Sequence, residues 1–124
     1  MISVRGPLTL VPTEAFAASK KRALKKFPDC NGDVDAFVDG LCQNPDQGDV
    51  FPSFQRITIR KVRLPLKAYG IGKSGGLRLL FFVYPDKMKL VPLFLYVKGQ
   101  FADEKKVRQA ANKTIQNVVK ELNS

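Results

Sequence analysis

Three strand-like segments follow one another in the second half of the chain, and the connections between them are short. Over residues 56–64 apolar and basic side chains alternate, which is the pattern of a half-buried strand. Residues 77–84 are more continuously apolar, and residues 90–98 form a third segment in which Pro92 indicates an edge or an irregularity. Because consecutive strands with short connections pair antiparallel, this half of the chain predicts an antiparallel sheet.

Two helices are predicted before these strands. After a short β-prone run at residues 8–11, Thr13 is a candidate N-cap of a helix that Pro28 ends. The Asn-Gly pair at residues 31–32 predicts a turn. In residues 33–42 the apolar side chains recur at the spacing of one helix face, which is typical of a helix packed on a core.

One more helix is predicted after the last strand. Asp103 is its candidate N-cap, and apolar residues at helical spacing continue to about Leu122. The chain, residues 1–124, shows no internal repeat and no linker. It therefore predicts a single small α+β domain with a largely antiparallel sheet.

Positive charge is concentrated in the middle of the sequence. The formal net charge is +10 at pH 7, and residues 54–101 carry ten Lys or Arg residues against one acid, Asp86. A field this one-sided favours a polyanionic partner, RNA or DNA first. A solvated basic face that aids solubility is the plainer alternative. An anionic membrane is less favoured, because the cations lie in strand-like segments and not on an amphipathic helix.

The residue types that are absent or rare limit the possible chemistry. The chain contains no histidine, which excludes a Ser-His-Asp triad and most zinc sites. Cys30 and Cys42 predict buried, reduced core residues of a cytoplasmic protein and not a disulfide. No apolar run approaches the roughly 18 residues of a membrane span, and the N-terminus does not have the pattern of a signal peptide.

The loop predicted at residues 66–76 contains three glycines in the spacing G-x-G-x-x-G, from Gly70 to Gly75. In dinucleotide-binding folds the third glycine opens a helix whose N-terminus meets the pyrophosphate. A strand-like run follows here, so no nucleotide-binding fold is predicted. Two interpretations remain: a backbone that approaches an anion between Lys67 and Lys73, or a hairpin connection with incidental lysines.

Four cations and a phenol are expected to gather on the sheet. Lys61 and Arg63 share one face of their strand because side chains alternate, and Arg78 on the next strand can lie close to them. Tyr96 and Lys98 share a face at the end of the third strand. Arginine grips phosphate oxygens in a fork of hydrogen bonds, and crowded cations lower one another's pKa, so that a lysine can act as a base. A phosphate-binding face without catalysis is the alternative.

Three short segments in the basic part of the chain form a recognisable set. They are RKVRL at residues 60–64, GKSGGLR at residues 72–78 and YVK at residues 96–98. Together and in this order they resemble the RelE/HigB-like toxins of bacterial type II toxin–antitoxin systems, over about residues 37–110. The resemblance implies the fold of the RelE/ParE superfamily: a mostly antiparallel four-stranded sheet with an N-terminal helical hairpin and a C-terminal helix.

The resemblance also implies an activity, that of an mRNA interferase. Such toxins are endoribonucleases that cut mRNA in the decoding site of the ribosome and use no metal or other cofactor. The ribose 2′-hydroxyl attacks the adjacent phosphate in line. A cognate antitoxin protein neutralises the toxin by covering its basic face, so mRNA on the ribosome and an antitoxin are the implied partners.

Roles for individual residues follow from their match to the family's positions. Lys61 would be the general base, beside Arg63 on the same strand, and Arg78 would stabilise the phosphorane. Lys98 would contact phosphate or protonate the leaving 5′ oxygen. Contacts to messenger or ribosomal RNA are expected from Arg60, Lys67, Lys73 and Tyr96.

Two departures from the family and two alternative functions accompany this assignment. Some members carry an arginine where Gly99 stands here, and some use a tyrosine near the C-terminus, whereas Tyr96 is the last tyrosine of this chain. A toxin like the related ParE proteins would inhibit DNA gyrase without cutting RNA. A non-catalytic RNA- or ribosome-binding module is the other alternative. The cluster argues for cleavage, because a gyrase inhibitor needs no phosphate-cutting set.

Overall fold

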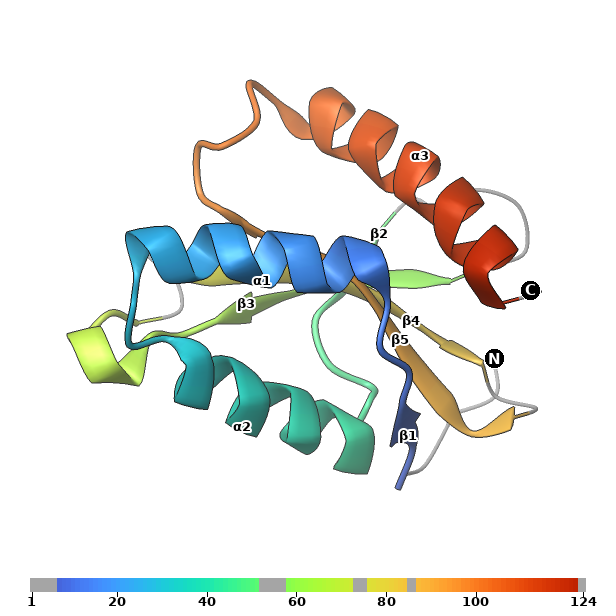
Figure 1. The fold of residues 1–124 in the computed structure, drawn as a ribbon, viewed down its shortest axis with the longest axis horizontal. Coiled ribbons are helices and arrows are strands. Elements are labelled where there is room, and N and C mark those ends of the chain that lie inside the picture. Colours follow the sequence, from blue (N-terminus) through green and yellow to red (C-terminus); the bar gives the residue numbers. More distant parts are fainter. Residues whose placement is uncertain (1–6, 52–57, 73–75, 85–86, 123–124) are drawn as a thin grey trace.

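A five-stranded mixed sheet and three helices make up the α+β fold of the computed structural model, which describes residues 7–51, 58–72, 76–84 and 87–122 (Figure 1). The strands lie in the order β1-β5-β4-β3-β2. Their bounds are β1 Thr9–Leu10, β2 Asp49–Phe51, β3 Ile59–Leu64, β4 Leu77–Tyr84 and β5 Lys89–Val97. The helices are α1 Glu14–Lys26, α2 Asn31–Gln43 and α3 Glu104–Leu122, with a short 3-10 turn, η1, at Lys67–Tyr69.

The predicted sheet of four largely antiparallel strands is only partly right. β2 is an additional strand that pairs antiparallel with β3, with Asp49 opposite Lys61. With three residues and an exposed Val50, it carries too little alternation to be seen in the sequence. β1 pairs in parallel with β5, with Thr9 opposite Lys89, so the sheet is mixed. Residues 56–57, the start of the strand predicted over residues 56–64, lie outside the described residues.

Both predicted helix N-caps are confirmed. The Thr13 Oγ1 accepts a hydrogen bond from the backbone N–H of Phe16 at 3.2 Å and begins α1. The Asp103 Oδ1 accepts one from the N–H of Lys106 at 3.0 Å and begins α3. Side-chain oxygens of this kind satisfy N–H groups that have no partner within the helix, which is why these positions could be read from the sequence.

The predicted turn at residues 31–32 is wrong, because these residues form the first turn of α2. The Asp33 carboxylate in that turn accepts the backbone N–H of Ala68 at 3.0 Å, and the Tyr69 hydroxyl accepts the N–H of Asp29 at 2.8 Å. The Asp33 carboxylate and the N–H of Asp29 therefore form hydrogen bonds with residues of η1, which lie far along the chain, and not with a local turn. The described part of the glycine loop is docked on the connection between α1 and α2.

Helices cover both faces of the sheet, α2 on one and α3 on the other (Figure 1). The core on the α2 side includes Cys30 and Cys42, both buried and unbridged as predicted. The core on the α3 side is built by Val107, Ala111, Ile115 and Val118 on side chains of β3, β4 and β5. Among the residues that the structure describes, no helix combines the length and hydrophobicity needed to cross a bilayer.

α1 runs along β5 (Figure 1). The predicted helical hairpin is therefore not one in which α1 and α2 pack mainly against each other, because α1 packs mainly on the sheet. The Ser19 Oγ accepts the backbone N–H of Leu95 at 2.9 Å, and the Thr13 Oγ1 donates to the carbonyl oxygen of Pro92 at 3.1 Å. Both hydrogen bonds are buried. Because β1 pairs only with the start of β5, α1 provides the partners that a further strand would otherwise supply.

A bulge in β5 decides which side chains face α3. Leu80 pairs with Phe94 and Phe81 pairs with Pro92, so Leu93 has no partner residue on β4. Proline has no N–H to give to a ladder, and the irregularity predicted at this position is confirmed. The extra residue reverses the alternation, so that every second residue from Phe94 onwards, including Tyr96, faces α3.

Gly76 is required by a close approach of two backbone segments and not by a ligand. A Cβ atom added at Gly76 would overlap the carbonyl oxygen of Leu64, where β3 ends beside the start of β4. A Cβ at Gly72 in the same loop would meet no atom of the described residues within 4 Å. β4 follows Gly76 directly, which agrees with the prediction that no helix follows the glycines.

We expect Gly76→Ala to lower the free energy of unfolding by about 2 kcal/mol or more, because backbone must shift to admit the methyl group. Chemical denaturation followed by circular dichroism measures the change. Gly72→Ala is the matched control and should leave the midpoint within experimental scatter. Equal effects of the two substitutions would contradict the close approach at Gly76.

Candidate nucleic-acid interface

Two neighbouring strands, β3 and β4, place cations side by side on the face that α3 partly covers. In the strand register Arg63 lies opposite Arg78, and Arg78 lies opposite Tyr96. Lys61, two residues before Arg63, points to the same face. The predictions that Lys61 and Arg63 share a face and that Arg78 lies close to them are confirmed. We call Lys61, Arg63 and Arg78 the cationic face.

Two arginines directly opposite each other in a sheet oppose folding, because like charges at paired positions repel. Arg63 is exposed to water, whereas Arg78 is half-buried and donates from Nη1 to the carbonyl oxygen of Gly76 at 3.1 Å. That hydrogen bond holds the Arg78 guanidinium at the edge of the glycine loop. An anion placed between the two arginines would relieve their repulsion.

Lys61 has an acidic partner that the sequence did not suggest. Its Nζ lies 3.3 Å from Oε1 of Glu104 in the first turn of α3, and the two residues are 43 positions apart in the chain. Glu104 is about half exposed, at 49% for its side chain, whereas Lys61 is at 24%. In the sequence Glu104 is distinguished only as an acid next to a helix cap, where any protein favours one.

Tyr96 is buried, so the predicted contact between Tyr96 and RNA is not available in this arrangement. Only 6% of the residue is exposed. The ring of Phe101 packs edge-on against it at 5.3 Å between centroids, and Phe94 flanks it at 5.8 Å. Burial, and next the negative charge of Glu104, raise the pKa of Tyr96 to about 12, against a smaller opposing effect of Arg78. The phenol is therefore protonated at neutral pH.

Two other predicted site residues that the structure describes do not join the cationic face. Arg60 points to the opposite side of β3, where its guanidinium lies 3.8 Å from Asp46 and donates to the carbonyl oxygen of Gly48 at 3.3 Å. Lys67 is exposed in η1, on the loop that docks against the two N-terminal helices. Lys73 lies outside the described residues.

Lys98 lies in a turn beyond the last strand. β5 ends at Val97, one residue earlier than predicted, and the N–H of Gln100 donates to the carbonyl oxygen of Val97 at 3.0 Å to close the turn. Gly99 adopts φ of 86°, a conformation that L side chains rarely take. Glycine is the residue that takes this conformation most readily.

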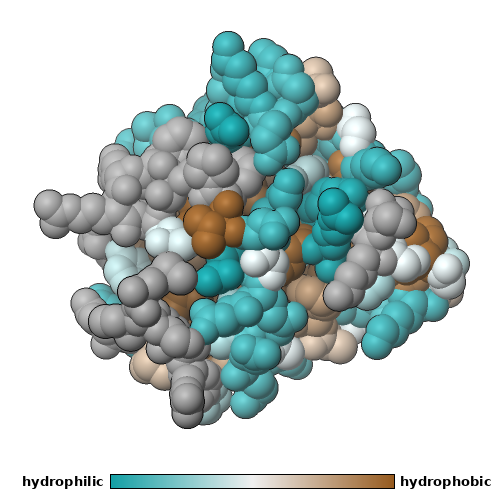
Figure 2. Space-filling model, turned by 180° about the vertical axis from the view of Figure 1, so that it is seen from behind, coloured by the Kyte–Doolittle hydropathy of each residue, from teal (hydrophilic) through white to brown (hydrophobic). Residues whose placement is uncertain are grey.

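Seen from behind, the molecule presents the edge of the sheet formed by β2 and β3, which are the distant strands of Figure 1. Among the residues coloured by hydropathy, Figure 2 shows many hydrophilic side chains on this side, with apolar atoms at several places between them. The exposed Arg63 and the partly exposed Lys61 belong to β3 and so to this edge. A long polyanion could therefore approach the cationic face from a side rich in polar groups.

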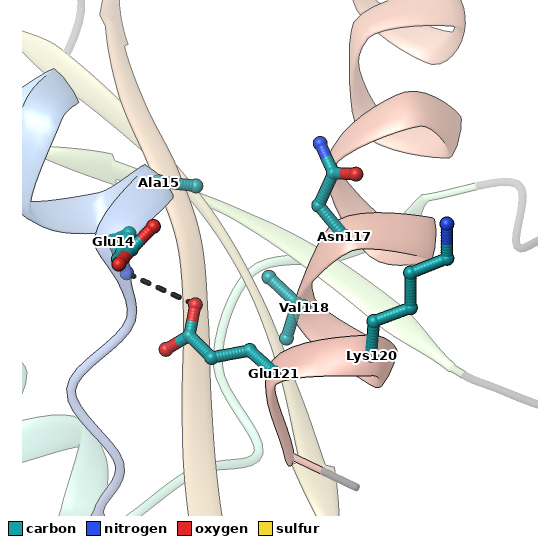
Figure 3. A pocket seen from close by; sticks show the side chains of 6 residues that line it. All are labelled: Glu14, Ala15, Asn117, Val118, Lys120 and Glu121. Atoms are coloured by element: carbon teal, nitrogen blue, oxygen red, sulfur yellow. Dashed lines mark hydrogen bonds between the residues drawn. The ribbon is translucent and has the colours of Figure 1, made fainter. Parts of the chain in front are cut away.

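Two pockets lined by described residues lie away from the cationic face. One is lined at the beginning of α1 and the end of α3, where Glu121 Oε1 accepts the backbone N–H of Glu14 at 3.3 Å (Figure 3). Another lies between the same helices and is lined by Arg22 and Phe101 among others. Neither pocket contains a cation of the cationic face. Among the described residues no group of three or more Cys, Asp or Glu side chains is placed to hold a metal ion.

Two comparisons with known proteins returned no match. No model of a known protein family matches the chain. No curated protein matches it either. The resemblance to RelE/HigB-like toxins therefore rests on the three basic segments of the sequence.

We expect Arg63→Thr to raise the free energy of unfolding by a few tenths of a kcal/mol up to about 1 kcal/mol, because it removes one of two opposed charges and threonine favours strands. The gain should shrink as salt screens the repulsion in the wild type. Thermal unfolding at low and high salt measures both effects. A loss of stability at low salt would show that the two guanidinium groups do not repel across the strands.

Alkaline titration tests the environment of Tyr96. Its phenol ionises near pH 10 when unfolded and near pH 12 when folded, so the unfolded state releases the proton first and stability falls as pH rises through this window. Tyr96→Phe should remove roughly 2 kcal/mol of that fall, and tyrosinate absorbance should lose its most alkaline component. Denaturation of wild type and variant between pH 9 and pH 12 measures the difference. Parallel profiles would mean that Tyr96 is open to water.

Proposed function

We propose that this protein is the toxin component of a type II toxin–antitoxin system and that it acts as a ribosome-dependent, metal-independent mRNA endonuclease. The observation that supports this most is the alignment of Lys61, Arg63 and Arg78 on one face of paired strands. Strand pairing holds these cations in place at a cost in electrostatic repulsion, which a phosphate ligand would offset. The position of the three basic segments, which resemble those of RelE/HigB-like toxins, supports the same function.

The chemistry of such a reaction matches the groups available. The ribose 2′-hydroxyl loses its proton and attacks the adjacent phosphorus, and the bond to the 5′ oxygen breaks as that oxygen takes up a proton. A 2′,3′-cyclic phosphate and a 5′-hydroxyl result. Arg78 and Arg63 would neutralise the charge that builds on the nonbridging oxygens, which is the largest contribution a preorganised site makes. In this proposal Tyr96, protonated at neutral pH, does not act as the base.

The role of Lys61 depends on its partner. A general base needs a free amine, and a carboxylate neighbour stabilises the ammonium form instead. While Glu104 is paired with it, Lys61 is suited to phosphate binding. Removal of a proton from the 2′-hydroxyl by Lys61 would require that the two side chains separate. Lys98, in its turn beyond β5, would contact a neighbouring phosphate of the bound strand.

The proposal is tested by induced expression followed by primer extension on translated mRNA. The wild type should arrest growth and produce cuts that disappear when ribosomes are withheld in a purified system. Lys61→Ala combined with Arg78→Ala should abolish both effects, because it removes two of the three cations that would surround the phosphate. Arg22→Ala combined with Lys113→Ala is the matched control, with the same charge removed from exposed helix positions, and should remain toxic.

Other outcomes separate the competing functions. Full toxicity of the Lys61 and Arg78 double variant would refute the assignment of the cationic face. Growth arrest without mRNA cuts, together with inhibition of DNA gyrase, would favour a ParE-like toxin. RNA binding without cuts or arrest would favour a non-catalytic RNA-binding module.

A further inference from the structure

The turn after β5 and the first residue of α3 engage two residues that the sequence placed in the candidate site, Tyr96 and Lys61. Phe101, between β5 and α3, covers the ring of Tyr96, with ring centroids 5.3 Å apart. Glu104, at the first position of α3, forms an ion pair with Lys61, with 3.3 Å between Oε1 and Nζ. The carboxylate that pairs with Lys61 stands where a phosphate of bound RNA would meet this cation.

Glu104 is the one of these two groups that can move at little cost. Its side chain is about half exposed, and an exposed ion pair contributes little to stability. The rest of α3 is anchored: Val107, Ala111 and Ile115 are buried against the sheet, and Glu121 near its end bonds to the start of α1 (Figure 3). A change of side-chain rotamer at Glu104 therefore frees Lys61 without moving the helix.

We propose that the carboxylate of Glu104 holds the place of an RNA phosphate at Lys61 and that single-stranded RNA binds by displacing it. This inference deepens the proposed function and rests on it for the identity of the ligand. Before binding, Glu104 reduces the repulsion among the cations of the sheet. After binding, a phosphate takes over that task, and the energy of the lost ion pair is subtracted from the affinity. Glu104 is thus a residue that sets affinity, not a group that takes part in bond breaking.

The inference is tested with Glu104→Gln and a short single-stranded RNA whose riboses carry 2′-O-methyl groups. Such an oligonucleotide cannot be cleaved through its 2′ oxygen, so binding is measured apart from chemistry. We expect the variant to bind about two- to fivefold more tightly at low salt, the factor that corresponds to an exposed ion pair. The slope of log affinity against log salt should also steepen, because the carboxylate that RNA displaces in the wild type takes up a cation from solution, and the variant has no such carboxylate.

Asp35→Asn is the matched control. Asp35 pairs with Lys20 at 2.6 Å between α1 and α2, is exposed at 57%, and its substitution changes the net charge by the same amount. Because this pair lies away from the cationic face, Asp35→Asn should change affinity by less than half as much and leave the salt slope unaltered. Thermal unfolding of both variants establishes that they are folded at the temperature of the binding measurement.

The outcomes distinguish this inference from the proposed function. If Glu104→Gln binds RNA no better than Asp35→Asn does while the wild type cuts mRNA on ribosomes, the place-holding role is refuted and the endonuclease stands. If Glu104→Gln binds more tightly with the steeper slope while no cuts are found, the place-holding role stands and the endonuclease does not. Weaker binding or lost cleavage in Glu104→Gln also refutes the inference, because it would show that the carboxylate itself contributes to RNA binding or to cleavage.

Discussion

The pairing of β4 with β3 on one side and with β5 on the other is the interaction on which the candidate interface depends. β4 is the middle of three antiparallel strands, and Leu79, Leu80, Phe81 and Phe82 alternate into the two cores that the helices cover. A residue slip in either pairing would move every side chain to the other face, at the cost of burying charges and exposing leucine and phenylalanine. Burial on both faces therefore holds Arg78 between Arg63 and Tyr96.

The α3 face of the sheet changes in character along its length. Toward Ile59 and Phe82 it is apolar, and the buried residues of α3 pack there. Toward Arg63 and Arg78 it is cationic, and the first turn of the helix and the preceding loop reach it. Buried side chains hold α3 from Val107 to Val118, whereas a half-exposed ion pair is the contact of its first residue, Glu104, with the sheet. The weaker contact lies where the proposed ligand would bind.

Much of the local structure could be predicted because local interactions determine it. The caps at Thr13 and Asp103, the core stripe of α2 and the strand character of β3 to β5 all depend on neighbours within a few residues. The same reasoning failed at residues 31–32, where Asp33 finds its partner across the chain in the loop before β4. It also missed β2, a strand too short to have a pattern of its own, which exists because β3 presents an edge for it.

The sequence by itself determined that Lys61 and Arg63 share a face, that the glycines precede a strand, and that the positive charge lies in the sheet half of the chain, because alternation and composition are properties of the chain alone. Only the tertiary structure decided which side chains those cations contact. The bulge at Leu93 brings Tyr96 to the face of Arg78, alternation sends Arg60 to the side of Asp46, and chain reversal after β5 brings Glu104 to Lys61. Each of these depends on contacts between residues far apart in sequence, for which no local pattern exists.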